Sequence, residues 1–215
     1  MAFTRLELVI VVLVVTVLVL VILPVLAKSR VKAQFTRCAD NLTQIGTAMN
    51  AWSNEHTNSV NAGDKYPAMV PTNFGGSLEF AGTGQAFRHF QAASNEIGST
   101  DLLVCPSDSR RRSGDWRTLA NSNVSYFISI EALVSEDSTM MFLAGDRHLN
   151  DVPPRKGQIL SVTTNSSLRF GKELHSGRGG HAIHVGGSLS YSESTLPYFI
   201  PTPLTNPFVN RLEFP

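Results

Sequence analysis

Charged residues are scarce in this sequence and are missing altogether from one long stretch. They make up 16% of the 215 residues, against about 25% in typical soluble domains, and none occurs at positions 8–27. The formal net charge is only +1, so the whole molecule offers no bulk attraction for nucleic acid or for acidic substrates. The distribution of charge therefore indicates a membrane segment attached to an ordinary globular part.

The signatures of several enzyme classes are also missing. No G-x-S-x-G nucleophile elbow occurs, and the GTG run at residues 82–84 lacks the Lys and Ser/Thr of a phosphate-binding loop. Arg110, Arg111 and Arg112, beside Trp116, could contact nucleic acid, but a solvated loop is the better interpretation. We therefore expect no catalytic site, no cofactor and no nucleic-acid partner.

Residues 8–27 form an apolar run made almost entirely of Val, Leu and Ile. A helix of 20 residues, at about 1.5 Å per residue, spans about 30 Å, the thickness of the hydrocarbon core of a bilayer. A secretory signal peptide would be shorter, with a basic region before it and a small-residue cleavage site after it. Arg5 is the only basic residue before this run. The sequence thus predicts a retained single-pass membrane helix, with a cleaved signal peptide as the alternative.

The helical pattern continues beyond this run in amphipathic form. Apolar side chains recur at alternating steps of three and four, at Val31, Phe35, Cys38, Leu42, Ile45, Met49 and Trp52. This spacing places them on one face of a helix. We expect one helix from about residue 5 to about residue 54, whose second half covers a globular head.

The head shows strand patterns mainly in its second half. Adjacent strands packed against one helix would form a small antiparallel sheet, which gives an α+β class. Proline is frequent from residue 196 onward, so we expect an irregular tail there. The expected strands cover residues 124–131, 139–144, 158–163, 181–185 and 188–191, the last two joined by a hairpin turn at Gly186 and Gly187.

The N-terminus resembles the processing site of type IV prepilins. Residues 2–9 read AFTRLELV and lead into the aliphatic run. In that family a dedicated peptidase cuts before a Phe and methylates the new amine, and a Glu four residues further on guides assembly. The resemblance implies cleavage between Ala2, where the family has Gly, and Phe3. It also implies that Glu7 is the assembly carboxylate and that Pro24 kinks the helix.

Segments of the head are similar to a group of pilin-like proteins abundant in Planctomycetes and Verrucomicrobia. Residues 175–188 resemble a glycine-rich stretch of that group, with His181 in place of an Asn and Gly186 in place of an Asp. The other similar segments are CADNLTQIG at residues 38–46, VCPSD at 104–108, NVSYF at 123–127 and LAGDR at 143–147.

This resemblance implies a pilin-like fold divided into four parts. Residues 1–2 would be a leader remnant, 3–27 the transmembrane and assembly helix, 28–57 its amphipathic continuation, and 58–215 the head. The chain would then be a pilin or pseudopilin of a type IV pilus-like or type II secretion filament. It would sit in the bacterial inner membrane with its head extracytoplasmic, and in a periplasmic or surface filament after assembly.

The partners implied by the resemblance are copies of the chain and other pilin-like subunits, the prepilin peptidase, an inner-membrane assembly platform and membrane lipid. Lys28, Arg30 and Lys32 follow the span, and the positive-inside rule alone would place that end in the cytoplasm. The alternatives are a single-pass anchored binding domain that never polymerises, and an anchored hydrolase or metalloenzyme that uses the region from His175 to His184.

The sequence contains two cysteines and three clustered histidines that could carry chemistry. Cys38 and Cys105 could form a disulfide in an extracytoplasmic head, while two buried thiols, or a metal or catalytic role, are the alternatives. His175, His181 and His184 are the best metal candidates. However, His181 and His184 point to opposite faces of an extended strand, and no nearby Cys or Asp completes a ligand set. We therefore expect no metal site.

Overall fold

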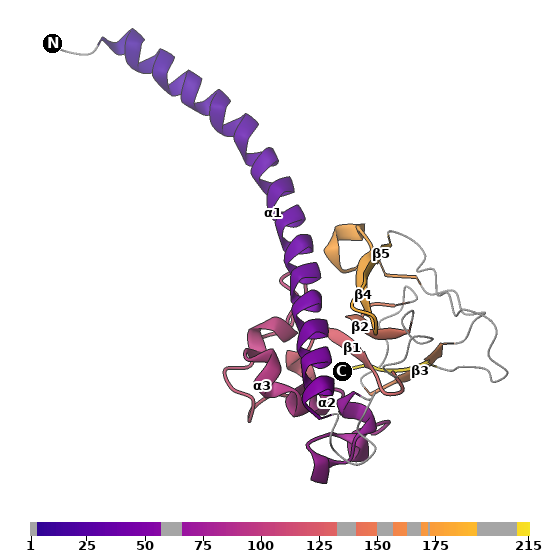
Figure 1. Ribbon diagram of the computed structural model, residues 1–215. Coiled ribbons are helices and arrows are strands. Elements are labelled where there is room, and N and C mark those ends of the chain that lie inside the picture. Colours follow the sequence, from indigo (N-terminus) through magenta and orange to yellow (C-terminus); the bar gives the residue numbers. More distant parts are fainter. Residues whose placement is uncertain are drawn as a thin grey trace.

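One helix of 51 residues dominates the molecule. The computed structural model describes residues 4–56, 66–132, 141–149, 157–162, 169–171, 173–192 and 210–215. Helix α1 (Arg5–Glu55) runs through Pro24 without a break, and its N-terminal half curves away from the head (Figure 1). The prediction of a single helix over residues 5–54 is thus confirmed to within one residue at its end.

The head contains a six-stranded sheet in which every pair of neighbours is antiparallel, in the order β3-β6-β1-β2-β4-β5. One long helix with this sheet confirms the α+β class. Five of the strands overlap the predicted segments. The strands are β1 (Tyr126–Ser129), β2 (Phe142–Asp146), β3 (Ile159–Val162), β4 (Gly180–His184), β5 (Leu189–Ser192) and β6 (Asn210–Glu213).

The predicted hairpin connects β4 and β5. Ile183 pairs with Leu189, the N–H of His184 donates to Ser188 O, and Gly187 has a φ of 79°, a value that glycine adopts readily. Short helices occupy other described parts of the head. They are η1 (Pro67–Met69), η2 (Thr72–Phe74), η3 (Leu78–Phe80), α2 (Phe87–Ala92), α3 (Ser94–Ile97), η4 (Thr100–Leu103), η5 (Asn121–Asn123) and η7 (His175–Gly177).

The second half of α1 packs on one face of the sheet. Leu42, Ile45 and Met49 are fully buried there, as the amphipathic pattern predicts. A Cβ atom at Gly46 would lie 2.2 Å from Ile183 Cδ1, so a glycine lets the helix approach β4 closely. A second, smaller cluster includes Phe127, Phe142, Phe170, Leu212 and Phe214. The sheet therefore lies between the main core and this cluster.

The prediction of an irregular C-terminal tail is wrong for its last residues. Strand β6 pairs with β1 on one side and β3 on the other, and Leu212 and Glu213 are fully buried. Residues 196–209 lie outside the described part. The sequence NRLE has little strand propensity, so its two partner strands decide its conformation.

Candidate functional site

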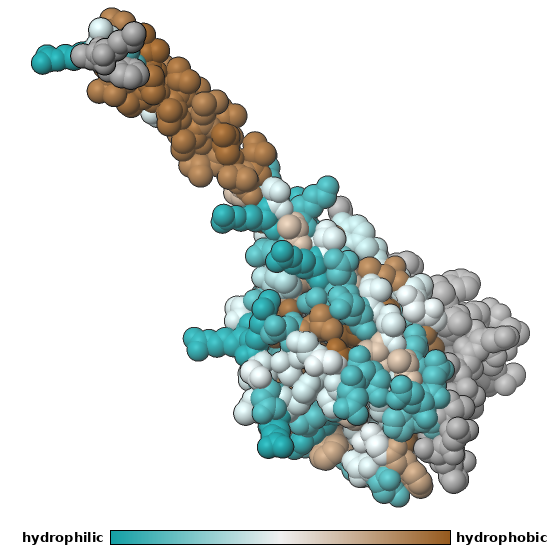
Figure 2. Space-filling model, turned by 60° about the vertical axis from the view of Figure 1, so that its left-hand side comes forward, coloured by the Kyte–Doolittle hydropathy of each residue, from teal (hydrophilic) through white to brown (hydrophobic). Residues whose placement is uncertain are grey.

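The N-terminal half of α1 exposes apolar side chains on all sides. Every residue from 4 to 30 is exposed, and Figure 2 shows the apolar surface gathered on this half of the helix. Within the described residues, α1 is the one helix long and apolar enough to cross a membrane. The described part of the head covers none of this segment, and an exposed apolar surface of this size is typical of a membrane or protein contact.

Glu7 begins this exposed segment and has a local partner. Its carboxylate accepts hydrogen bonds from the N–H and the hydroxyl of Thr4, both at 2.9 Å, and its own N–H donates to Thr4 Oγ1 at 3.3 Å. This reciprocal pair is a capping box, which satisfies the first backbone groups of the helix. The predicted processing residues, Ala2 and Phe3, lie outside the described part.

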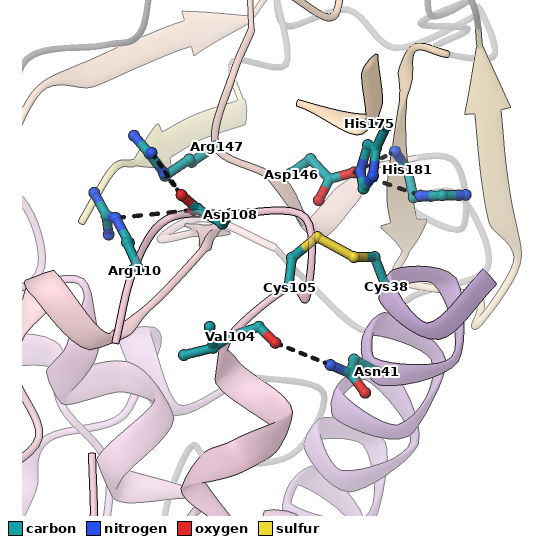
Figure 3. Close-up of a disulfide and its surroundings, with 10 residues drawn as sticks. All are labelled: Cys38, Asn41, Val104, Cys105, Asp108, Arg110, Asp146, Arg147, His175 and His181. Atoms are coloured by element: carbon teal, nitrogen blue, oxygen red, sulfur yellow. Dashed lines mark hydrogen bonds and ion pairs between the residues drawn. A yellow bond between two sulfur atoms is a disulfide. The ribbon is translucent and has the colours of Figure 1, made fainter. Parts of the chain in front are cut away.

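A disulfide fastens α1 to the head. Cys38 on α1 and Cys105 after η4 are joined by an S–S bond of 2.03 Å, and both are fully buried. The side-chain amide of Asn41 donates to Val104 O at 3.3 Å beside the disulfide (Figure 3). The alternatives of two free thiols, or of a thiolate metal site, therefore do not apply to the oxidised protein.

A buried carboxylate lies next to two of the candidate histidines. Asp146 Oδ2, at the end of β2, is 3.0 Å from His175 Nε2 and 3.4 Å from His181 Nδ1 (Figure 3). The backbone N–H of His181 also donates to Asp146 Oδ2 at 2.7 Å. Burial alone would raise the pKa of Asp146, but the hydrogen bond from His175 and the closeness of both imidazoles more than offset it, so the pKa is lowered. The carboxylate is therefore ionised inside the protein.

The expectation that no Asp joins the histidines is wrong. Asp146 precedes His175 by 29 residues, and the two meet because η7, which carries His175, leads directly into β4, the strand that pairs with β2. Spacing along the sequence cannot show this contact, although Asp146 belongs to LAGDR, one of the segments that resemble the pilin-like group. His184 points elsewhere: its Nε2 is 2.6 Å from Ser190 Oγ, and its ring lies 4.9 Å from that of Phe142.

A second buried polar chain anchors the C-terminal strand. Ser77 Oγ lies 2.8 Å from His89 Nδ1, and His89 Nε2 lies 3.4 Å from Glu213 Oε2, which also accepts from the N–H of Gly82 at 2.8 Å. Ser77 is 1% exposed and the other two side chains 0%. These three side chains are the residue types of a hydrolase triad, but they are enclosed, so a substrate cannot reach them. Their hydrogen bonds hold β6 in place.

Arg110, one of the three consecutive arginines, stabilises the fold through hydrogen bonds to the backbone. Arg110 donates to the carbonyl oxygens of Asn121 and Val124, and to Pro215 O at 3.0 Å. Burial and the nearby Arg147 lower the pKa of Arg110 to about 10. Arg110 therefore clamps the C-terminus and is not available to a ligand.

Comparisons of this protein with known families, proteins and structures found no match. No family model matches the sequence, and no match was found among the curated proteins or among the solved structures.

Proposed function

We propose that this chain is a pilin-like subunit, held in the inner membrane by the first half of α1 and able to assemble into a filament through that same segment. The observation that carries the proposal is that the two halves of α1 lie in different environments, one exposed and one packed against the head. Residues 4–30 are exposed throughout, whereas Cys38, Leu42 and Trp52 of the same helix are fully buried in the head. In this proposal, lipid covers this apolar surface before assembly, and the helices of identical or other pilin-like subunits cover it afterwards.

The continuity of α1 supports a retained anchor over a cleaved signal peptide. The helix passes from the apolar segment into the head without interruption, and the disulfide at Cys38 holds it there. Cleavage after residue 27 would cut within a regular helix, where backbone hydrogen bonds resist a peptidase. Cleavage before Phe3 would leave the helix whole.

Glu7 supplies the charge that would select a neighbouring subunit. An ionised carboxylate at the edge of an apolar segment costs about 2.5–3.5 kcal/mol in lipid, and a positively charged N-terminal amine from an adjacent subunit would offset that cost. In the isolated chain Thr4 supplies the only hydrogen bonds to the Glu7 carboxylate among the described residues. That observation favours a second candidate, a non-polymerising anchored domain in which Glu7 is a helix cap.

One substitution separates the two candidates. Glu7→Gln keeps a capping box, because glutamine can accept the same hydrogen bonds, but it removes the charge. For a filament subunit we expect Glu7→Gln to abolish cross-linked multimers and sheared filaments in cells. Normal multimers in this variant would refute the assembly role and leave the anchored domain.

Two measurements complete the test. Glu55→Gln is the matched control, since Glu55 is an exposed carboxylate at the other end of α1, and it should assemble normally. Mass spectrometry of the N-terminus from membranes should find a methylated Phe3. An intact Met1 would contradict the proposed processing.

A further inference from the structure

The cluster of Asp146, His175 and His181 is not used by the proposed assembly. Its residues come from three segments, the end of β2, the short helix η7 and the start of β4 (Figure 3). Their side chains are 1%, 0% and 3% exposed, respectively. Burying one carboxylate with two imidazoles is costly unless the polar atoms are paired, so the cluster requires an explanation.

The spacing of the side-chain atoms suits a metal ion. Asp146 Oδ2 lies 3.0 Å from His175 Nε2 and 3.4 Å from His181 Nδ1, and the three residues offer ligand atoms that all lie within 4.8 Å of one another. Bonds of about 2.0–2.2 Å to a tetrahedral ion place neighbouring ligand atoms about 3.4 Å apart. Little movement is therefore needed to bind such an ion.

The polar atoms of the cluster are incompletely satisfied without an ion. Asp146 Oδ1, His175 Nδ1 and His181 Nδ1 are buried and have no hydrogen-bond partner among the residues that the structure describes. His181 Nδ1 faces the Asp146 carboxylate at 3.4 Å without hydrogen-bonding to it. A buried polar atom left in this state costs about 1–3 kcal/mol. A cation between the carboxylate and this nitrogen would remove part of that cost.

The backbone at His175 is strained in a way that serves the cluster. His175 and Ser176 have φ values of 57° and 55°, in the left-handed region that residues other than glycine rarely adopt. Such strain, about 1–3 kcal/mol for each residue, is concentrated at ligand and active sites. Here it places the imidazole of His175 against Asp146, while the hydrogen bond from the N–H of His181 orients the carboxylate.

We propose that Asp146, His175 and His181 bind one divalent transition-metal ion, and that Zn²⁺ fits them best. Two imidazole nitrogens and one carboxylate oxygen form a common zinc ligand set with one position left for water. Ca²⁺ and Mg²⁺ prefer oxygen ligands throughout. The sulfurs of Cys38 and Cys105 also approach His175, but they are bonded to each other and provide no thiolate.

The ion would have a structural role. The ring of Phe35, on α1, lies 5.0 Å from that of His175 and 4.1 Å from that of His181, so the cluster is covered where α1 leaves the head. An enclosed site of this kind excludes substrate. Metal binding would tie η7 to β2 and β4 beneath the helix, next to the disulfide.

The test uses the full chain in detergent, carrying no histidine tag, stripped with chelator and kept without reductant so that the disulfide stays closed. Dialysis against Zn²⁺ followed by elemental analysis should find one equivalent, and Zn²⁺ should raise the Tm. Co²⁺ should give the intense visible absorption of a tetrahedral site. Asp146→Asn and His181→Gln should each weaken Zn²⁺ binding by more than about 100-fold.

Control variants distinguish binding at this site from non-specific binding of Zn²⁺. His148→Gln changes a neighbouring histidine that pairs with Glu173, and it should keep one equivalent of Zn²⁺, as should Glu7→Gln, which tests assembly separately. The proposal is overturned if the wild-type chain binds no Zn²⁺, if Ca²⁺ binds as tightly, or if the two cluster variants bind normally. Should those variants fail to fold, the Co²⁺ spectrum of the wild-type chain decides alone.

Discussion

At the scale of single residues, buried ion pairs determine how the head responds to acid. Arg147 donates two hydrogen bonds to Asp108, at 2.8 and 2.9 Å, and Asp108 is only 1% exposed. Burial by itself would raise the pKa of Asp108, but the bonds to Arg147 and the nearby charge of Arg110 lower it below its usual 3.8. Because the folded pKa is lower than the unfolded one, ionised Asp108 stabilises the head above about pH 4.

We expect Asp108→Asn to reduce the free energy of unfolding by about 3 kcal/mol at pH 7, because it leaves two arginines with a neutral partner. The difference from the wild-type chain should shrink as the pH falls below about 4 and Asp108 is protonated in both folding states. Urea titrations in detergent, followed by the fluorescence of the buried Trp52, would measure both effects.

The matched control for this prediction is Asp101→Asn. Asp101 lies 3.7 Å from Arg112, and both side chains are more than half exposed, so its loss should cost less than about 1 kcal/mol. A pH-independent difference between Asp108→Asn and the wild-type chain would contradict the role of the carboxylate.

At the scale of elements, two features join α1 to the head. The first is close packing, in which Ile45 and Met49 are buried and Gly46 allows contact with Ile183. The second is the disulfide between Cys38 and Cys105, which are 67 residues apart in the sequence. Packing is enough to orient the helix, whereas the covalent bond restricts the unfolded chain.

Replacing both cysteines by serine should therefore lower stability without undocking the helix. A loop of this size corresponds to about 4 kcal/mol in the entropy model. We expect the Cys38→Ser, Cys105→Ser variant to unfold at lower urea concentration, with an unchanged native fluorescence from Trp52. Reductant should lower the stability of the wild-type chain to that of the variant and leave the variant unaffected; equal stability without reductant would refute the prediction.

At the scale of the whole molecule, apolar exposure is confined to one end. Large exposed apolar side chains fill positions 6–26 of α1, whereas those described in the head are Phe74, Leu78, Leu189 and Tyr191. All the buried residues of α1 lie at or after Cys38. The head and the apolar segment should thus be separable.

A chain that begins at residue 28 should be soluble and monomeric, because it lacks the apolar segment and retains Cys38 and the buried face of α1. Light scattering after size exclusion would measure its mass, and the full chain should need detergent under the same conditions. Aggregation of the shortened chain would show that the head exposes a further apolar surface.

The features that the sequence predicted are those that depend on neighbours along the chain. The spacing from Val31 to Trp52 predicts the buried face of α1, the charge-free run predicts its exposed half, and Gly186 and Gly187 predict the hairpin. Each follows from helical or extended geometry over a few residues.

Long-range pairing decided the rest. The tertiary structure alone places β6 between β3 and β1, brings Asp146 to His175 and His181, and links Ser77, His89 and Glu213. The side chains that contact one another through Asp146 and through His89 are 12 to 124 positions apart in sequence, and they are polar, so no apolar periodicity marks them. By itself the sequence determined the long helix, its exposed apolar half and most strands; only the packed sheet decided which buried polar groups meet, because strand order follows from contacts distant in sequence.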